Sequence, residues 1–212
     1  MNKLTEQIFG ISPYGYFTSQ ETATLFPDSA DRRYGLVKRA LAGGEIIQIR
    51  RGLYCLAPKF QKKKINLYSL SEHIHGPSYI SLESALSWHG LIPEAVYTLT
   101  SATLGKSKVF QSPLGVFSYT HIPQKIFYAG VERLTDEAGD VFFMASPIKA
   151  LADYVHAHKK DWTGFKQCAE DLRIEPDEMT AAAVDEIDLL LENYTSRRVG
   201  GFLKGVRREL GR

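Results

Sequence analysis

The spacing of apolar residues near the start of the chain predicts three helices. Residues 3–10 predict a short first helix. Ser19 is expected to cap a second short helix, which Pro27 ends. Residues 29–42 predict a longer third helix, because leucine, valine and alanine side chains recur along one side of it. Two glycines follow this segment, as is typical after a helix end.

A β-hairpin is predicted directly after the third helix, in the segment EIIQIRRGLYCLAP. Apolar and β-branched residues on both sides of Arg50-Arg51-Gly52 favour strands, and the glycine suits a tight turn. The order of helix, short helix, turn, longer helix and hairpin is typical of a winged helix-turn-helix. We therefore assign residues 1–58 to a DNA-binding domain of this kind.

Beyond this module, residues 59–65 predict a basic linker and residues 66–212 a second domain. Its pattern predicts helices near residues 66–75, from Ser81 to Gly90, and from Pro147 to about His158. Strand-like runs occupy residues 96–103, 107–112, 115–122 and 140–146. The expected fold class is α+β: an N-terminal winged helix-turn-helix, then a mixed α/β domain with a small antiparallel-rich sheet and a helical C-terminal end.

The net charge of +2 conceals an uneven distribution along the chain. Residues 1–64 contain 11 basic and 5 acidic side chains, a balance of +6, whereas residues 65–212 contain 15 and 19, a balance of −4. A basic N-terminal module is the charge pattern expected of a nucleic-acid-binding domain.

Within the predicted DNA-binding module, the third helix and the hairpin turn supply the candidate contacts. On a helical wheel the side opposite the apolar stripe is basic and lacks bulky apolar groups, so it can enter the major groove. Gly35 would permit a close approach to the duplex. Arg33 lies toward the apolar stripe but could reach a phosphate. The predicted DNA-binding residues are Arg32, Arg33, Tyr34, Lys38, Arg39, Arg50 and Arg51.

Signals of other chemistry are weak. The sequence has no phosphate-binding loop, dinucleotide fingerprint or nucleophile elbow, so we expect no enzyme, no catalytic residue and no cofactor. His73 and His75 are two positions apart and, on a helix, would not face each other, and His89 is at a predicted helix end; we expect no metal site. Cys55 and Cys168 are interpreted as reduced thiols.

Two charged segments near the C-terminus admit more than one interpretation. Residues 185–192 contain four acidic side chains, interpreted as the exposed face of a helix rather than as a Mg²⁺ site. The tail, residues 196–212, predicts a basic amphipathic helix. It could bind a partner or DNA, or pack on the chain's own acidic segment at residues 129–193, which we favour.

Three segments resemble the AbiEi family, the antitoxin half of AbiE abortive-infection systems. They are the hairpin EIIQIRRGLYCLAP, the stretch YISLESALSWHGLIPEAVYTLTSAT from Tyr79 to Thr103, and ASPIKALADYV from Ala145 to Val155. The resemblance implies a winged-helix repressor that binds inverted repeats in double-stranded DNA of its own promoter. It also implies a second domain that counteracts a co-encoded nucleotidyltransferase-like toxin in phage defence.

The expected function is therefore a DNA-binding antitoxin and autorepressor. The alternative is a stand-alone transcriptional regulator whose second domain binds an effector or a protein. The sequence has no apolar run of the ~20 residues that a membrane span needs and no secretion signal at its start. We therefore expect a cytoplasmic protein with no membrane partner.

Overall fold

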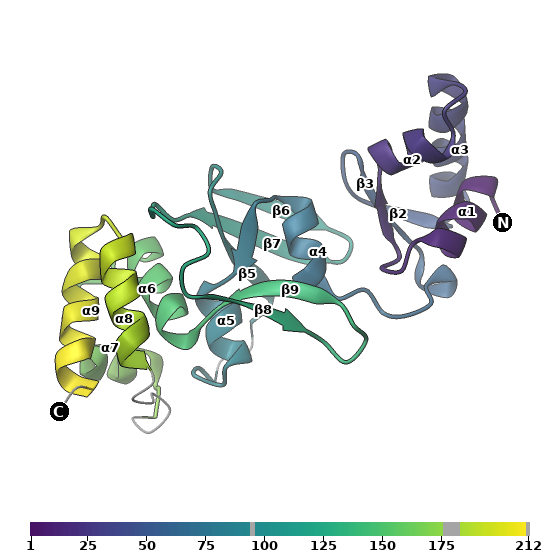
Figure 1. The fold of residues 1–212 in the computed structure, drawn as a ribbon. Helices are drawn as coiled ribbons and strands as arrows, with labels where there is room; N and C mark the ends of the chain where they lie inside the picture. The colour runs from purple at the N-terminus through teal and green to yellow at the C-terminus, as the bar shows by residue number, and fades with distance from the viewer. Residues whose placement is uncertain (94–95, 176–182, 211–212) are drawn as a thin grey trace.

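The computed structural model describes residues 1–93, 96–175 and 183–210 and has an α+β fold, which confirms the expected class (Figure 1). Within these residues one sheet has three antiparallel strands and the other has six strands in a mixed arrangement. The first sheet lies near the N-terminus, the second forms the middle of the molecule, and helices form the end that contains the C-terminus.

The N-terminal module consists of three helices and the three strands of the smaller sheet. Its elements are α1 (Lys3–Ile11), β1 (Tyr16–Thr18), α2 (Ser19–Leu25), α3 (Ala30–Ala42), β2 (Ile46–Arg50) and β3 (Leu53–Leu56). Strand β3 lies between β1 and β2 and pairs with both in antiparallel fashion. The three predicted helices and the hairpin are therefore present.

Two details at the start of α2 differ from the sequence prediction. Ser19 is the first helical residue, and Thr18 is the N-cap. Thr18 Oγ1 accepts from the Glu21 backbone N–H at 3.2 Å, while the Glu21 carboxylate accepts from the Thr18 N–H at 2.6 Å. This reciprocal capping box fixes the helix start one residue earlier than expected. Thr18 also ends strand β1, which the sequence analysis did not predict.

The second part of the chain is built on the six-stranded sheet, whose order is β6-β7-β5-β4-β9-β8. Its strands are β4 (Ser78–Ile80), β5 (Thr98–Thr103), β6 (Lys108–Ser112), β7 (Gly115–His121), β8 (Val131–Thr135) and β9 (Val141–Ala145). The four predicted runs correspond to β5, β6, β7 and β9. Strands β4 and β8 were not predicted, so the sheet is larger than expected.

Helices cover both faces of this sheet. Helix α4 (Leu67–Ile74) lies on one face, where its Ser71 hydroxyl contacts that of Ser101 at 2.9 Å. Helix α5 (Leu82–Trp88) lies on the other, where the Ser84 N–H donates to Thr100 Oγ1 at 2.9 Å. Successive residues of a strand point to opposite faces, so Thr100 and Ser101 place the two helices on opposite sides of β5.

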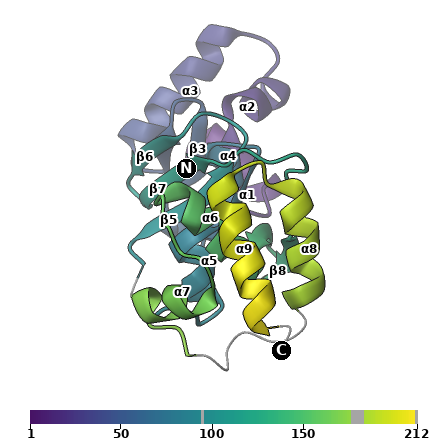
Figure 2. The ribbon, with the colours of Figure 1, turned by 90° about the vertical axis from the view of Figure 1, so that its left-hand side faces the viewer.

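The C-terminal end is a group of helices that pack against one another (Figure 2). They are α6 (Pro147–Ala157), α7 (Phe165–Leu172), α8 (Ala183–Asn193) and α9 (Arg197–Leu210). The apolar stripe of α9 is buried against the other three. On its polar side Arg198 pairs with Asp161 at 3.0 Å and Arg207 with Asp188 at 2.7 Å. The tail therefore packs on the chain's own acidic segment, as expected.

The two parts of the chain share buried contacts instead of being joined only by a linker. One apolar cluster contains Tyr16 and Leu53 from the N-terminal module together with Leu70 and Phe117 from the second part. The Tyr16 hydroxyl lies 3.0 Å from that of Ser69 in α4. These contacts fix how the N-terminal module sits on the six-stranded sheet.

Part of the predicted basic linker is also held by acidic partners. The Lys63 ammonium donates to Asp140 at 2.6 Å and to the Ala138 carbonyl at 3.0 Å, both in the β8–β9 connection. Asn66, the first residue after the predicted linker, donates to Asp136 in the same connection at 2.7 Å. In the part of the chain that the structure describes, no helix has the length and apolar character that crossing a membrane requires.

Candidate nucleic-acid interface

Helix α3 lies at the end of the molecule opposite the C-terminal helices (Figure 1). Ser29 caps it, accepting from the Arg32 N–H at 3.4 Å, and Gly43 is its C-cap. Leu36 and Ala40 are buried against the rest of the module, which leaves the opposite side of the helix exposed.

The exposed side of α3 carries four of the seven predicted DNA contacts, namely Arg32, Tyr34, Lys38 and Arg39. Tyr34 is 70% exposed. Among the described residues neither Lys38 nor Arg39 has a carboxylate partner. Their charges are therefore not neutralised by a carboxylate among the described residues.

The Arg39 guanidinium folds back over Gly35. A Cβ placed on Gly35 would lie 3.2 Å from one of its terminal nitrogens. The space that the glycine leaves is thus occupied by an arginine of the same helix, one turn later. A Cβ at residue 35 would therefore require the Arg39 guanidinium to shift by a few tenths of an ångström.

Arg32 and Arg33 make local contacts at the start of α3. Arg32 forms an ion pair with Asp28, and both side chains are largely exposed. Arg33 is half-buried, and its guanidinium donates to the Phe26 carbonyl at 3.0 Å. It thereby satisfies a backbone acceptor that the end of α2 leaves open. Arg33 closes the connection between the two helices, so its charge is less available than that of its neighbours.

The two predicted DNA-binding arginines of the hairpin turn, Arg50 and Arg51, point in different directions. Gly52 has a positive φ of +79°, which a glycine adopts without strain, and Arg51 beside it is exposed. Arg50 turns the other way. Its guanidinium donates to the Arg51 carbonyl and to the His73 carbonyl at the end of α4, each at 3.0 Å. Arg50 therefore fastens the hairpin to the second part of the chain, and Arg51 remains free at the tip.

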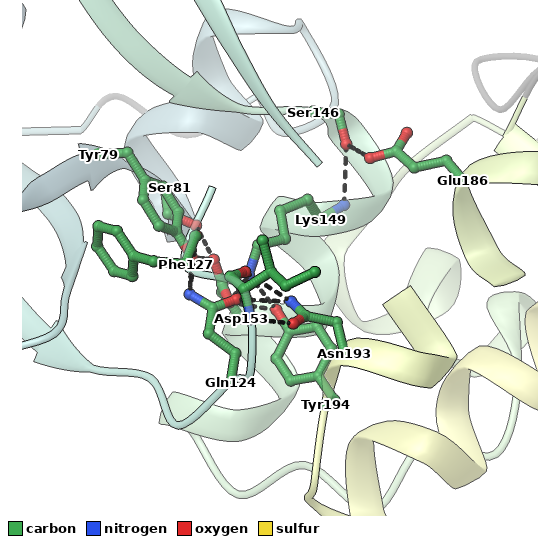
Figure 3. Close-up of polar contacts among 11 residues, drawn as sticks. Tyr79, Ser81, Gln124, Phe127, Ser146, Lys149, Asp153, Glu186, Asn193 and Tyr194 are labelled. Atoms are coloured by element: carbon green, nitrogen blue, oxygen red, sulfur yellow. Dashed lines mark hydrogen bonds and ion pairs between the residues drawn. The ribbon is translucent and has the colours of Figure 1, made fainter. Parts of the chain in front are cut away.

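A second polar cluster, which the sequence analysis did not single out, lies buried between the six-stranded sheet and the C-terminal helices (Figure 3). Lys149 and Asp153, one turn apart on α6, have fully buried side chains and form an ion pair of 2.8 Å. The Lys149 ammonium also donates to Gln124 Oε1 at 2.7 Å and to the Tyr194 hydroxyl at 2.6 Å.

The Asp153 carboxylate is surrounded by donors. It accepts from Tyr79 at 3.0 Å, from Ser81 at 2.7 Å, from Lys149, and from Tyr194. Burial, reinforced by the nearby Asp153 charge, raises the pKa of the Tyr79 and Tyr194 hydroxyls well above their ordinary value. Burial lowers the pKa of Lys149.

Every polar group at the centre of this buried cluster is hydrogen-bonded to another described side chain. The cluster joins strand β4, the segment before β8, helix α6 and the end of α8. Its chemistry therefore suits a structural junction. The signal in the sequence was a lysine and an aspartate four residues apart in an otherwise largely apolar segment.

Groups of three or more metal-ligating side chains are absent from the residues that the structure describes. His73 and His75 bracket the end of α4, and His89 contacts the Ala145 carbonyl at 2.9 Å. Comparison of the chain with protein-family models and with curated proteins gives no match.

Proposed function

We propose that the chain is a sequence-specific DNA-binding protein whose N-terminal module is a winged helix-turn-helix. The observation that carries this proposal is that Lys38 and Arg39 on the exposed side of α3 have no carboxylate partner among the described residues, together with the free Arg51 at the hairpin tip. In this proposal α3 enters the major groove, where Lys38 and Arg39 meet base edges or phosphates. Arg51 contacts the sugar-phosphate backbone or the adjacent minor groove.

The other predicted DNA contacts take different roles in the proposal. Tyr34 packs against the duplex beside Lys38, and Arg32 reaches a phosphate once its exposed ion pair with Asp28 opens. An exposed pair of this kind contributes only about 0–1 kcal/mol, so a phosphate can replace the carboxylate at little cost. Arg33 and Arg50 position α3 and the hairpin through their backbone contacts.

The resemblance to AbiEi antitoxins extends the proposal to the operon. The chain would repress its own promoter by binding inverted repeats, and its second part would counteract a co-encoded nucleotidyltransferase-like toxin. A stand-alone regulator whose second domain binds an effector or a protein is the second candidate. The cavity described below lies mainly in the N-terminal module and does not by itself favour that candidate.

A gel-shift titration tests the DNA-binding proposal. The full chain is titrated onto the DNA upstream of its own gene and onto a random duplex, each at two salt concentrations. The proposal predicts selective binding to the upstream DNA. It also predicts weaker binding at higher salt, because phosphate contacts release counterions from the DNA and that release is less favourable when the salt concentration is high. Equal binding to both duplexes would contradict it.

A matched pair of variants locates the contact. Arg51→Ala should weaken binding to both duplexes, whereas Arg133→Ala should leave it unchanged. Arg133 is an exposed arginine of β8, the sheet edge opposite β6. Equal effects of the two substitutions would show that only overall charge matters and would refute a role for the hairpin.

A further inference from the structure

A cavity of about 320 Å³ opens between α1, β1 and α2, and His73 at the end of α4 closes part of it. Its size falls at the lower end of the range of small-molecule sites. It lies at the junction between the N-terminal module and the second part of the chain, outside the proposed DNA-binding face of α3.

The walls of this junction cavity are mainly apolar and aromatic. Tyr14 and Tyr16 line it as a stacked pair, with ring centroids 5.6 Å apart, and the His73 ring lies 4.9 Å from that of Tyr16. Ile11, at the end of α1, is 58% exposed at the cavity. Large apolar side chains left in contact with water beside a concave site are available to cover the body of a ligand.

Glu21 supplies the only carboxylate among the cavity-lining residues. One of its oxygens, Oε2, accepts from the Thr18 N–H and hydroxyl at 2.6 and 2.8 Å. The other, Oε1, has no hydrogen-bond partner among the described residues. Burial raises the pKa of the Tyr16 hydroxyl to about 12, and the charge of Asp140, with a smaller contribution from Glu21, adds to this rise.

We infer that the junction cavity binds a small organic cation with a flat apolar body. The free carboxylate oxygen of Glu21 accepts hydrogen bonds from the cationic head, and the tyrosine and isoleucine side chains cover the body. Charge-assisted hydrogen bonds are about twice as strong as neutral ones, so the positive charge should decide which ligands bind. Helix α2 carries Glu21 and directly precedes α3, so an occupant would touch the element next to the proposed DNA-binding helix.

Three probes of the same shape and different charge test this inference: benzamidine, benzamide and benzoate. Each is titrated calorimetrically into the full chain at millimolar concentrations and neutral pH. Benzamidine should bind at least about tenfold more tightly than the other two. Binding of benzamide as tight as that of benzamidine, or no binding of benzamidine, would overturn the inference.

Glu21→Gln removes the charge while the glutamine retains the capping box, so the helix start is preserved. It should weaken benzamidine binding about tenfold and lower the thermal unfolding midpoint only slightly, because the start of α2 loses one favourable charge. The matched control is Glu6→Gln, which removes an exposed carboxylate of α1 that does not line the cavity. Unchanged benzamidine binding in Glu21→Gln, or an equal loss in both variants, would refute the assignment. Benzamidine binding is measured in the absence of DNA, so a negative result would leave the proposal of DNA binding intact.

Discussion

Replacing Lys149 with methionine should destabilise the second part of the chain strongly. Methionine approximates the length and volume of the lysine stem but removes an ammonium group that makes three hydrogen bonds in a fully buried site. The Asp153 carboxylate is then buried without a counter-charge. Removing one partner of a buried ion pair typically costs 3–5 kcal/mol. Asp153 keeps three hydroxyl donors, so we expect a loss of about 3 kcal/mol, near the lower end.

Urea unfolding followed by tryptophan fluorescence measures this loss, because both tryptophans lie in the second part of the chain. The control, Lys166→Met, changes an exposed lysine of α7 and should alter the free energy of unfolding by less than about 0.5 kcal/mol. Adding Asp153→Asn to Lys149→Met removes the unpaired charge and should recover at least about 1 kcal/mol. A loss below about 1 kcal/mol in the single variant, or a further loss in the double variant, would refute the structural role of the pair.

Three other expectations concern the hairpin, α9 and a buried thiol. Arg50→Ala should cost about 1–2 kcal/mol of stability, because it removes the hydrogen bonds that hold the hairpin. Arg51→Ala should leave the free energy of unfolding in urea unchanged. It should reduce the slope of log affinity for DNA against log salt concentration by about one unit. Gly205→Ala would place a Cβ 1.6 Å from the oxygen of a backbone carbonyl and should destabilise the protein by about 3 kcal/mol or more. Gly201 lies in the same helix with open space around it, so Gly201→Ala should stabilise the protein by about 0.5–1 kcal/mol, measured by thermal unfolding. Burial raises the pKa of Cys168 to about 12, so at pH 8 iodoacetamide should label it only after unfolding, and rapid labelling of the native protein would contradict its burial.

Most elements with strong periodic signals could be predicted from the sequence, whereas the three-residue strands β1 and β4 and the five-residue edge strand β8 could not. Helix α3 combines an apolar stripe, a capping serine and a following glycine, and its predicted and observed spans agree to within one residue. Strands β1 and β4 have three residues each, too few to show alternation, and exist because longer partner strands pair with them. The cap of α2 was displaced because Thr18 and Ser19 are both good capping residues, and only the reciprocal bond to Glu21 selects Thr18.

The candidate interface was predicted by residue type but not by orientation. Arg50 and Arg51 are equivalent in a charge count, yet neighbouring residues at a hairpin turn point in different directions. The contact between Arg50 and the end of α4 joins residues 23 positions apart and has no local signature. The Lys149 cluster likewise gathers side chains from four separate elements, so only the local spacing of Lys149 and Asp153 was visible beforehand.

The most direct test of the central claim is the affinity ratio between the upstream DNA and a scrambled duplex of the same composition. Fluorescence anisotropy measures it for the wild type, for Arg39→Ala and for the control Arg133→Ala. The wild type should prefer the upstream DNA, and Arg39→Ala should weaken that complex by about 1–3 kcal/mol with little change for the scrambled duplex. Arg133→Ala should match the wild type. An affinity ratio near one in the wild type, or a ratio that Arg39→Ala leaves unchanged, would contradict base recognition by α3.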